Sequence, residues 1–336
     1  MIIKNNVLEK ISYVFIDFIK CRTDKKYRII KKTNKMIKSI IIPEEIKNIN
    51  KNVNLDNIGE EFKPCIEEFI KVLNDNFDEE LLNNFYHNLR TLKIVRKNSK
   101  YYDSKGIEGI YDYDSNTIFI YNNKYDKTIF HELFHMASSN IISKQRKFIG
   151  FHQYTSLLGT LDIGKGINEG YTEYLTQELF GENNRCGYNF EVFMASYTEA
   201  IIGCDKIAKY YLKADLKGLI NEMSKYEKKE NVYTFLRGLD YYNRNCRDKK
   251  VRENVCLCVD YCINFIFTSY LNHLRYMYDN NFMSKDDVIE NIICVYNDMS
   301  FDLFDCNEHF ELNFDIFVDN VDKVFNDILD VKEVII

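Results

Sequence analysis

Apolar residues recur at helical spacing through most of the chain. In residues 1–90, apolar positions three and four apart predict helices, most clearly around residues 11–19, 69–73 and 81–89. From Phe190 onward the spacing is again helical. The chain has only 2 Pro and 13 Gly, so few helix-breaking residues interrupt these patterns. The sequence therefore predicts a mainly helical protein.

The spacing of apolar residues changes from helical to strand-like in the middle of the chain. Residues 92–95, 107–113 and 117–121 are rich in β-branched and aromatic residues, and the turn-forming residues 114–116 separate the last two. This pattern predicts a short strand followed by a β-hairpin. Apolar helical spacing then resumes near residue 128, and the helix is expected to run to about residue 142.

Five glycines fall within residues 150–170, and this segment is expected to be a loop. A second helix is predicted from about residue 168 to residue 180. Asn168 is its expected N-cap, and Gly181 is its expected C-terminal stop.

Composition narrows the class of protein. With 46% hydrophobic and 29% charged residues, the chain resembles a soluble globular protein rather than a disordered, collagenous or disulfide-stapled one. The formal net charge of −6 argues against nucleic acid as a partner. The apolar run at 255–271 contains Asp260 and Asn264 and falls short of a membrane span, so a buried helix and no membrane partner are expected.

Targeting signals and cysteine spacing bear on the compartment. Residues 1–10 do not have the pattern of a signal peptide, and the 10 cysteines contain no CxxC pair. A cytoplasmic location with reduced thiols is therefore expected.

One short motif carries recognisable chemistry. Residues 131–135 read His-Glu-Leu-Phe-His, an HExxH motif inside a predicted helix. Residues four apart lie on one helix face, so His131 and His135 can share one metal ion. Glu132 lies about a quarter turn from His131. Its carboxylate therefore flanks the metal and can take a proton from a water activated there.

A second cluster lies downstream. Glu169 and Glu173 are again four apart, near the start of the second predicted helix. A catalytic zinc needs three protein ligands, and Glu169 can be the third. Glu173, one turn on, can accept a hydrogen bond from a ligand imidazole. Alone, the two carboxylates would favour a solvated acidic face, with Glu at favourable positions near a helix N-terminus. Beside an HExxH motif, they indicate a Zn²⁺ site.

Together, HELFH at 131–135 and INEGYTEYL at 167–175 resemble the gluzincin branch of the HExxH zinc metallopeptidases, which includes thermolysin-like and aminopeptidase-like enzymes. The resemblance covers roughly residues 105–181. The roles that it implies are zinc ligands at His131, His135 and Glu169, a general base at Glu132, and a carboxylate hydrogen-bonded to a ligand histidine at Glu173.

The resemblance also implies an edge strand before the HExxH helix that holds an extended substrate. An open strand edge offers unpaired N–H and C=O groups with which a peptide can pair. The strand expected in this role comprises Thr117, Ile118, Phe119, Ile120 and Tyr121.

The sequence departs from the family pattern in two respects. Residues 136–168 separate His135 from Glu169, which is a longer gap than in thermolysin-like enzymes. No motif identifies the residue that would stabilise the tetrahedral intermediate. On spacing, His152 remains an alternative to Glu169 as the third zinc ligand. The candidates for the stabilising residue are His152, Tyr154, Tyr171 and His273.

The fold expected from these features is α+β and mainly α. It comprises an N-terminal helical region (1–100), a zincin-like catalytic core with a small β-sheet (101–185) and a C-terminal helical region (186–336). The expected function is a zinc-dependent metallopeptidase that hydrolyses an intracellular protein or peptide. The alternatives are a zincin-fold interaction or regulatory protein that binds zinc without turnover, and a helical scaffold with a chance HExxH.

Overall fold

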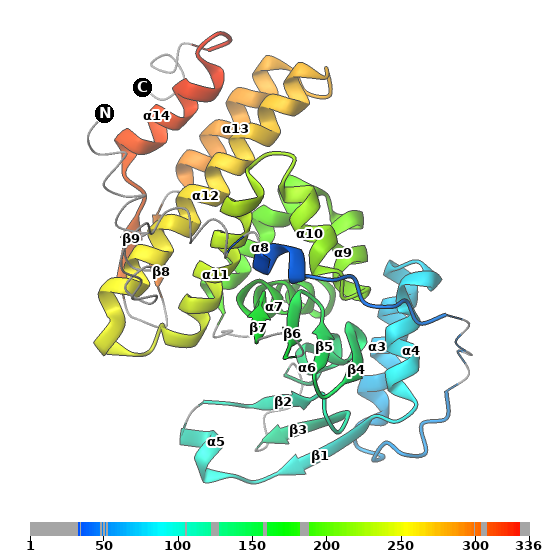
Figure 1. The fold of residues 1–336 in the computed structure, drawn as a ribbon. Helices are drawn as coiled ribbons and strands as arrows, with labels where there is room; N and C mark the ends of the chain where they lie inside the picture. Colours follow the sequence, from blue (N-terminus) through cyan, green and yellow to red (C-terminus); the bar gives the residue numbers. More distant parts are fainter. Residues whose placement is uncertain are drawn as a thin grey trace. The chain divides into compact units, whose positions relative to one another are not determined.

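The computed structural model describes residues 33, 35–47, 49, 51, 53–104, 106–121, 128–156, 160–181, 188–298, 300–303 and 308–329. The predicted helix at 11–19 lies outside them. The described chain is α+β and mainly helical, as the sequence predicts (Figure 1).

The chain divides into two compact units. The first, here called the motif unit, comprises Ile40–Cys186 and Cys204–Leu219, and the second comprises Met1–Ser39, Gly187–Gly203 and Ile220–Ile336. Residues 40–100, which were expected in a separate N-terminal region, therefore belong to the same unit as the HExxH motif.

The motif unit combines helices with two β-sheets. Its helices are α3 (Lys63–Asn76), the 3-10 turn η1 (Glu79–Leu82), α4 (Asn83–Leu89), α5 (Lys100–Ser104), α6 (Thr128–Ala137), α7 (Lys165–Phe180), α9 (Cys204–Leu212) and the first half of α10 (Leu216–Met223). Its strands are β1 (Lys93–Lys97), β2 (Gly109–Asp112), β3 (Thr117–Tyr121), β4 (Ser139–Ser143), β5 (Arg146–Ile149), β6 (His152–Thr155) and β7 (Leu161–Ile163).

The predicted hairpin is confirmed, but the prediction that residues 117–121 form a free edge is wrong. Strands β2 and β3 pair in antiparallel fashion, and β1 pairs with the other side of β3 in parallel, so the order is β1-β3-β2. Thr117, Ile118, Ile120 and Tyr121 are all buried. A strand with apolar side chains on both faces is typical of a sheet centre. The strand beside α6 at the sheet edge is β2.

Helix α6 ends earlier than predicted. It stops at Ala137, and β4 begins at Ser139, whereas the apolar spacing predicted helix to about residue 142. Ser138 Oγ donates to the carbonyl of Phe134 at 2.9 Å, and Ser139 Oγ donates to that of His135 at 2.7 Å. Serine hydroxyls that bond to the preceding turn compete with helix continuation, and the β-branched residues that follow favour a strand.

Aromatic rings pack α6 against two other helices of the motif unit. All residues of α6 from Ile129 to Ala137 are buried. The ring of Phe134 lies 5.0 Å from that of Phe69 in α3, and the ring of Phe130 lies 4.0 Å from that of Phe180 in α7. The rings of Phe69 and Phe180 also contact each other at 5.6 Å, so one aromatic cluster fixes the apolar side of the HExxH helix and thereby positions its two histidines.

The segment 150–170, expected to be a loop, contains strands β6 and β7 and the start of helix α7. Strands β4 to β7 form an antiparallel meander in the order β4-β5-β6-β7. Helix α7 begins at Lys165 after a left-handed Gly164, so Asn168 is inside the helix and is not the N-cap. The C-terminal stop at Gly181 is confirmed, with φ 84°.

Gly164 has no room for a side chain. Its φ is 83°, and a Cβ atom there would lie 2.1 Å from the backbone carbonyl oxygen of Phe151. Backbone strain and this clash together are expected to make Gly164→Ala cost about 3 kcal/mol or more in unfolding free energy.

Gly106→Ala is the matched control, because Gly106 also has a positive φ, 65°, but no atom within 4 Å of the added carbon. Strain alone predicts a loss of about 1 kcal/mol there. Urea unfolding measures both variants, and equal losses would contradict the proposed clash.

Over its described residues, the second unit is helical apart from one hairpin. Its elements are α8 (Asn189–Ile202), α11 (Lys229–Asn245), η2 (Lys249–Val251), α12 (Arg252–Asp279), α13 (Lys285–Asn297), β8 (Ser300–Leu303), β9 (Glu308–Glu311) and α14 (Phe314–Phe325). The helical pattern from Phe190 onward predicted these helices but not the β8–β9 hairpin.

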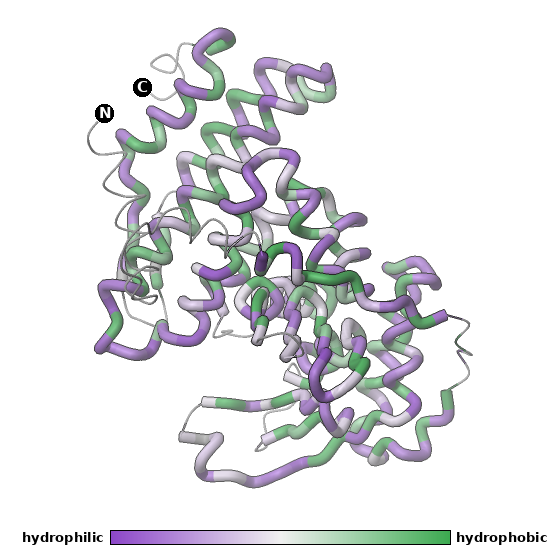
Figure 2. The backbone as a smooth tube through the Cα atoms, viewed as in Figure 1, coloured by the Kyte–Doolittle hydropathy of each residue, from purple (hydrophilic) through white to green (hydrophobic). Residues whose placement is uncertain are grey.

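Helix α12 is the core helix of the second unit. By length and composition alone, Lys249–Asp279 could cross a membrane, although 61% of its most apolar window is buried. It packs against α8, α11, α13 and α14. Apolar and polar residues alternate along α12 and α13 (Figure 2). Burial of the apolar residues by neighbouring helices is typical of a core helix.

Candidate metal centre

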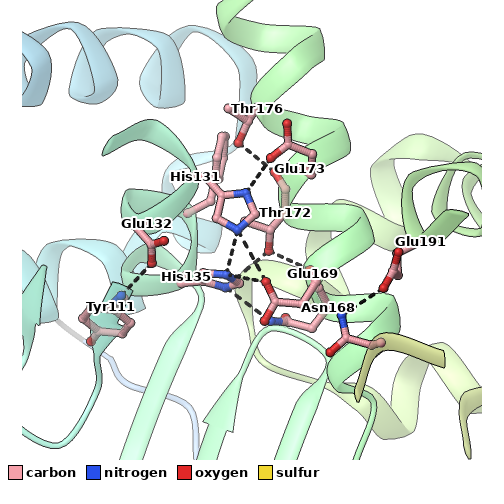
Figure 3. A network of polar contacts seen from close by, with 12 residues as sticks. Tyr111, His131, Glu132, His135, Asn168, Glu169, Thr172, Glu173, Thr176 and Glu191 are labelled. Atoms are coloured by element: carbon pink, nitrogen blue, oxygen red, sulfur yellow. Dashed lines mark hydrogen bonds and ion pairs between the residues drawn. The ribbon is translucent and has the colours of Figure 1, made fainter. Parts of the chain in front are cut away.

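Helices α6 and α7 bring two imidazoles and a carboxylate together inside the motif unit (Figure 3). His131 and His135 lie one turn apart on α6, with 3.1 Å between their Nε2 atoms. Glu169 of α7 places Oε2 3.2 Å from Nε2 of His135 and 3.5 Å from Nε2 of His131. Both histidines are 8% exposed, so the group is sheltered from water but reachable.

These distances fit a zinc ion. Zinc bonds of about 2.0–2.1 Å in tetrahedral geometry put neighbouring ligand atoms about 3.3 Å apart. The three separations in the structure range from 3.1 to 3.5 Å. Two imidazole nitrogens and one carboxylate oxygen are also the ligand chemistry that suits zinc in catalytic sites. The donor set is therefore compatible with one zinc ion and an open fourth position.

Glu173 lies where the four-residue spacing predicts. Its Oε2 is 2.7 Å from Nδ1 of His131, and its other oxygen accepts a hydrogen bond of 3.2 Å from Gln177 Nε2. A carboxylate at Nδ1 keeps a proton there, so that a metal bound to His131 would take the Nε2 position. The contact fixes the ring orientation of His131 and, when Nε2 has lost its proton, the tautomer.

Glu132 stands beside the ligand group and is held from the neighbouring strand. The backbone N–H of Tyr111 in β2 donates to Glu132 Oε2 at 2.6 Å. A Cβ atom on Gly109 would lie 3.1 Å from Glu132 Cγ and 2.4 Å from Thr128 Cγ2, so glycine at this position permits the close approach of β2 to α6. Burial raises the pKa of Glu132, and the two histidines and the Tyr111 N–H oppose that rise.

The buried charges of the ligand group stabilise one another. Burial by itself would lower the pKa of His131, but the hydrogen bonds to Glu169 and Glu173 outweigh it and raise the pKa to about 10. Burial by itself would raise the pKa of Glu169, but His135 and His131 hold it well below its usual range. The metal-free site therefore carries a proton on His131 at neutral pH, in the place where a metal would bind.

The release of this proton on zinc binding can be measured. An ordinary histidine, with a pKa of about 6.5, is neutral at pH 8 and would release almost no proton when it binds zinc. Because the pKa of His131 is raised to about 10, we expect zinc binding at pH 8 to release about one proton from this residue. Calorimetry in buffers of different ionisation enthalpy measures the release, and zinc binding without it would contradict the raised pKa.

The other candidates from the sequence are not part of the group of candidate ligands. His152 lies in β6, and its Nε2 is 2.8 Å from Asp162 Oδ1. Tyr154 is opposite Asp162 across the β6–β7 pair. Tyr171 is fully buried and packs against aromatic rings, and His273 lies in α12 of the second unit. Glu169 rather than His152 completes the group of candidate ligands.

Two contacts at the site have little signal in the sequence. Tyr111 acts through its backbone N–H, which any residue except proline would supply. Asn168 was expected as a cap, yet its Oδ1 accepts from the N–H of Phe151 and its Nδ2 lies 3.3 Å from Nδ1 of His135.

Comparison with protein-family models, with curated proteins and with solved structures gives no match for this chain.

Proposed function

We propose that this protein is a zinc-dependent metallopeptidase of the gluzincin type, with a zincin-like core formed by α6, α7 and the β1-β3-β2 sheet. The observation that carries the proposal is the convergence of His131, His135 and Glu169 within zinc-ligand distances of one another. A carboxylate outside that group, Glu132, lies on the same helix and is held by β2.

The chemistry divides between the ion and the chain. A zinc ion in this site supplies a Lewis acid that polarises a carbonyl and acidifies a water. Glu132 accepts the proton of the attacking water and then passes it to the leaving amine. The N–H of Tyr111 keeps the carboxylate in place for both transfers, because it bonds to one oxygen and leaves the other available.

The surroundings of the site orient His131 and raise the pKa of Glu132. Glu173 holds His131 with Nε2 directed at the ligand group. Burial raises the pKa of Glu132 above its ordinary value, which favours a carboxylate that can return the proton it accepts. The proposed substrates are peptides or proteins of the cell interior.

The function is tested by cleavage of a broad peptide library with the zinc-loaded full chain. We expect cleavage that is lost with a chelator and regained when zinc is added back. Stoichiometric zinc without any cleavage would contradict the peptidase and would favour a zinc-binding interaction protein. A protein that takes up no zinc would contradict both.

A further inference from the structure

His135 has a second nitrogen that faces away from the ligand group. Its Nε2 is directed at His131 and Glu169. Its Nδ1 has two polar neighbours, both from α7: Asn168 Nδ2 at 3.3 Å and Thr172 Oγ1 at 3.4 Å. An imidazole whose Nε2 binds a metal carries its proton on Nδ1, and that proton needs an acceptor.

Asn168 cannot be that acceptor. Its Oδ1 accepts the backbone N–H of Phe151 at 2.9 Å, which fixes the orientation of the amide. The reversed amide would set its NH₂ group against the N–H of Phe151, two donors facing each other. The group that Asn168 presents to His135 is therefore its NH₂, which can only donate.

Thr172 can accept. Its hydroxyl has one hydrogen and two lone pairs. It lies 2.7 Å from the carbonyl oxygen of Asn168 and 2.6 Å from the hydroxyl of Tyr211. Whichever of these two the threonine donates to, a lone pair remains for Nδ1–H of His135. Thr172 is fully buried, so no water competes for that proton.

We propose that Thr172 is the positioning residue that sets the tautomer of His135, as Glu173 does for His131. The two neighbours of Nδ1 favour opposite tautomers. Acceptance by Thr172 keeps the proton on Nδ1 and leaves Nε2 free for a metal, whereas donation by Asn168 would put the proton on Nε2 and block it. This inference rests on the proposed metal site, and the peptidase activity is not needed for it.

Thr172→Val removes the acceptor with little change in shape. We expect it to lower zinc affinity about 10–100-fold, measured by competition with a chromophoric chelator. Thr172→Ser keeps the hydroxyl and should bind zinc as the parent does. Thr176→Val is the matched control, because Thr176 lies one turn on in α7 and its buried hydroxyl donates to the carbonyl of Thr172 at 2.8 Å. Its zinc affinity should not change.

NMR of the imidazole rings gives a readout that packing alone would not move. In the zinc-loaded parent, Nε2 of His135 is occupied and Nδ1 carries the proton, so the Nδ1–H signal is expected at the shift of a proton hydrogen-bonded to oxygen, and Thr172→Val should move it to the shift of an unbonded proton. An unbonded shift in the zinc-loaded parent would overturn the proposal even if the valine variant does not fold. Parent-like zinc affinity in Thr172→Val, or an equal loss in Thr176→Val, would also overturn it. A parent that binds zinc normally but cleaves no peptide would remove the proposed function and leave this inference standing.

Discussion

Glu132→Gln is expected to abolish turnover while zinc stays bound. Glutamine has nearly the same shape and can still accept the N–H of Tyr111, which now bonds to Glu132 at 2.6 Å. Its amide cannot take a proton from water, and loss of a general base costs at least ~10²-fold in rate. Since Glu132 is not in the ligand group, the three candidate zinc ligands are untouched. The measurements are kcat/KM on a cleaved peptide and zinc content by elemental analysis.

The control for this variant is Glu178→Gln, the same change at an exposed position of α7. It should keep both zinc and activity. If Glu132→Gln cleaved peptide at the parent rate, the proposed proton transfer would be wrong.

Glu169→Ala is expected to lose zinc, and Glu173→Ala to weaken its binding less. The first change removes one of three ligands and leaves His131 and His135 facing each other at 3.1 Å without the carboxylate. The second removes only the hydrogen bond that orients His131, a kind of loss that typically costs ~10–100-fold in metal affinity. Zinc dissociation constants of the two variants, with Glu178→Ala as the control, measure the difference.

Parent-like zinc binding in Glu169→Ala would point to another third ligand. His152 would then be the first residue to test, because the sequence alone leaves it open in that role. The 2.8 Å contact between His152 and Asp162 would have to break for it to bind. His152→Ala in the Glu169→Ala background separates the two possibilities.

Local features of the site could be predicted because their spacing is set by helix geometry. Residues four apart share a helix face, so the sequence alone pairs His131 with His135 and Glu169 with Glu173. The β2–β3 hairpin was predictable for the same reason, since alternation and a turn at 114–116 are local signals.

Features that depend on distant parts of the chain could not be predicted in this way. The central position of β3 follows from its parallel pairing with β1, and residues 117–121 do not by themselves identify β1 as the second partner. The contact of Thr172 with Tyr211 of α9 is likewise tertiary. The β4–β7 meander was missed because apolar spacing indicated helix to about residue 142 and glycines indicated a loop over 150–170, and strands this short carry little alternation.

The most direct test of the proposed zinc site is anomalous X-ray diffraction at the zinc edge from crystals of the zinc-loaded chain. We expect a peak within about 2.0–2.2 Å of His131 Nε2, His135 Nε2 and a carboxylate oxygen of Glu169. Glu132 should lie beside the peak and outside bonding distance. A zinc peak elsewhere, with the two histidines and Glu169 still hydrogen-bonded to one another, would contradict it.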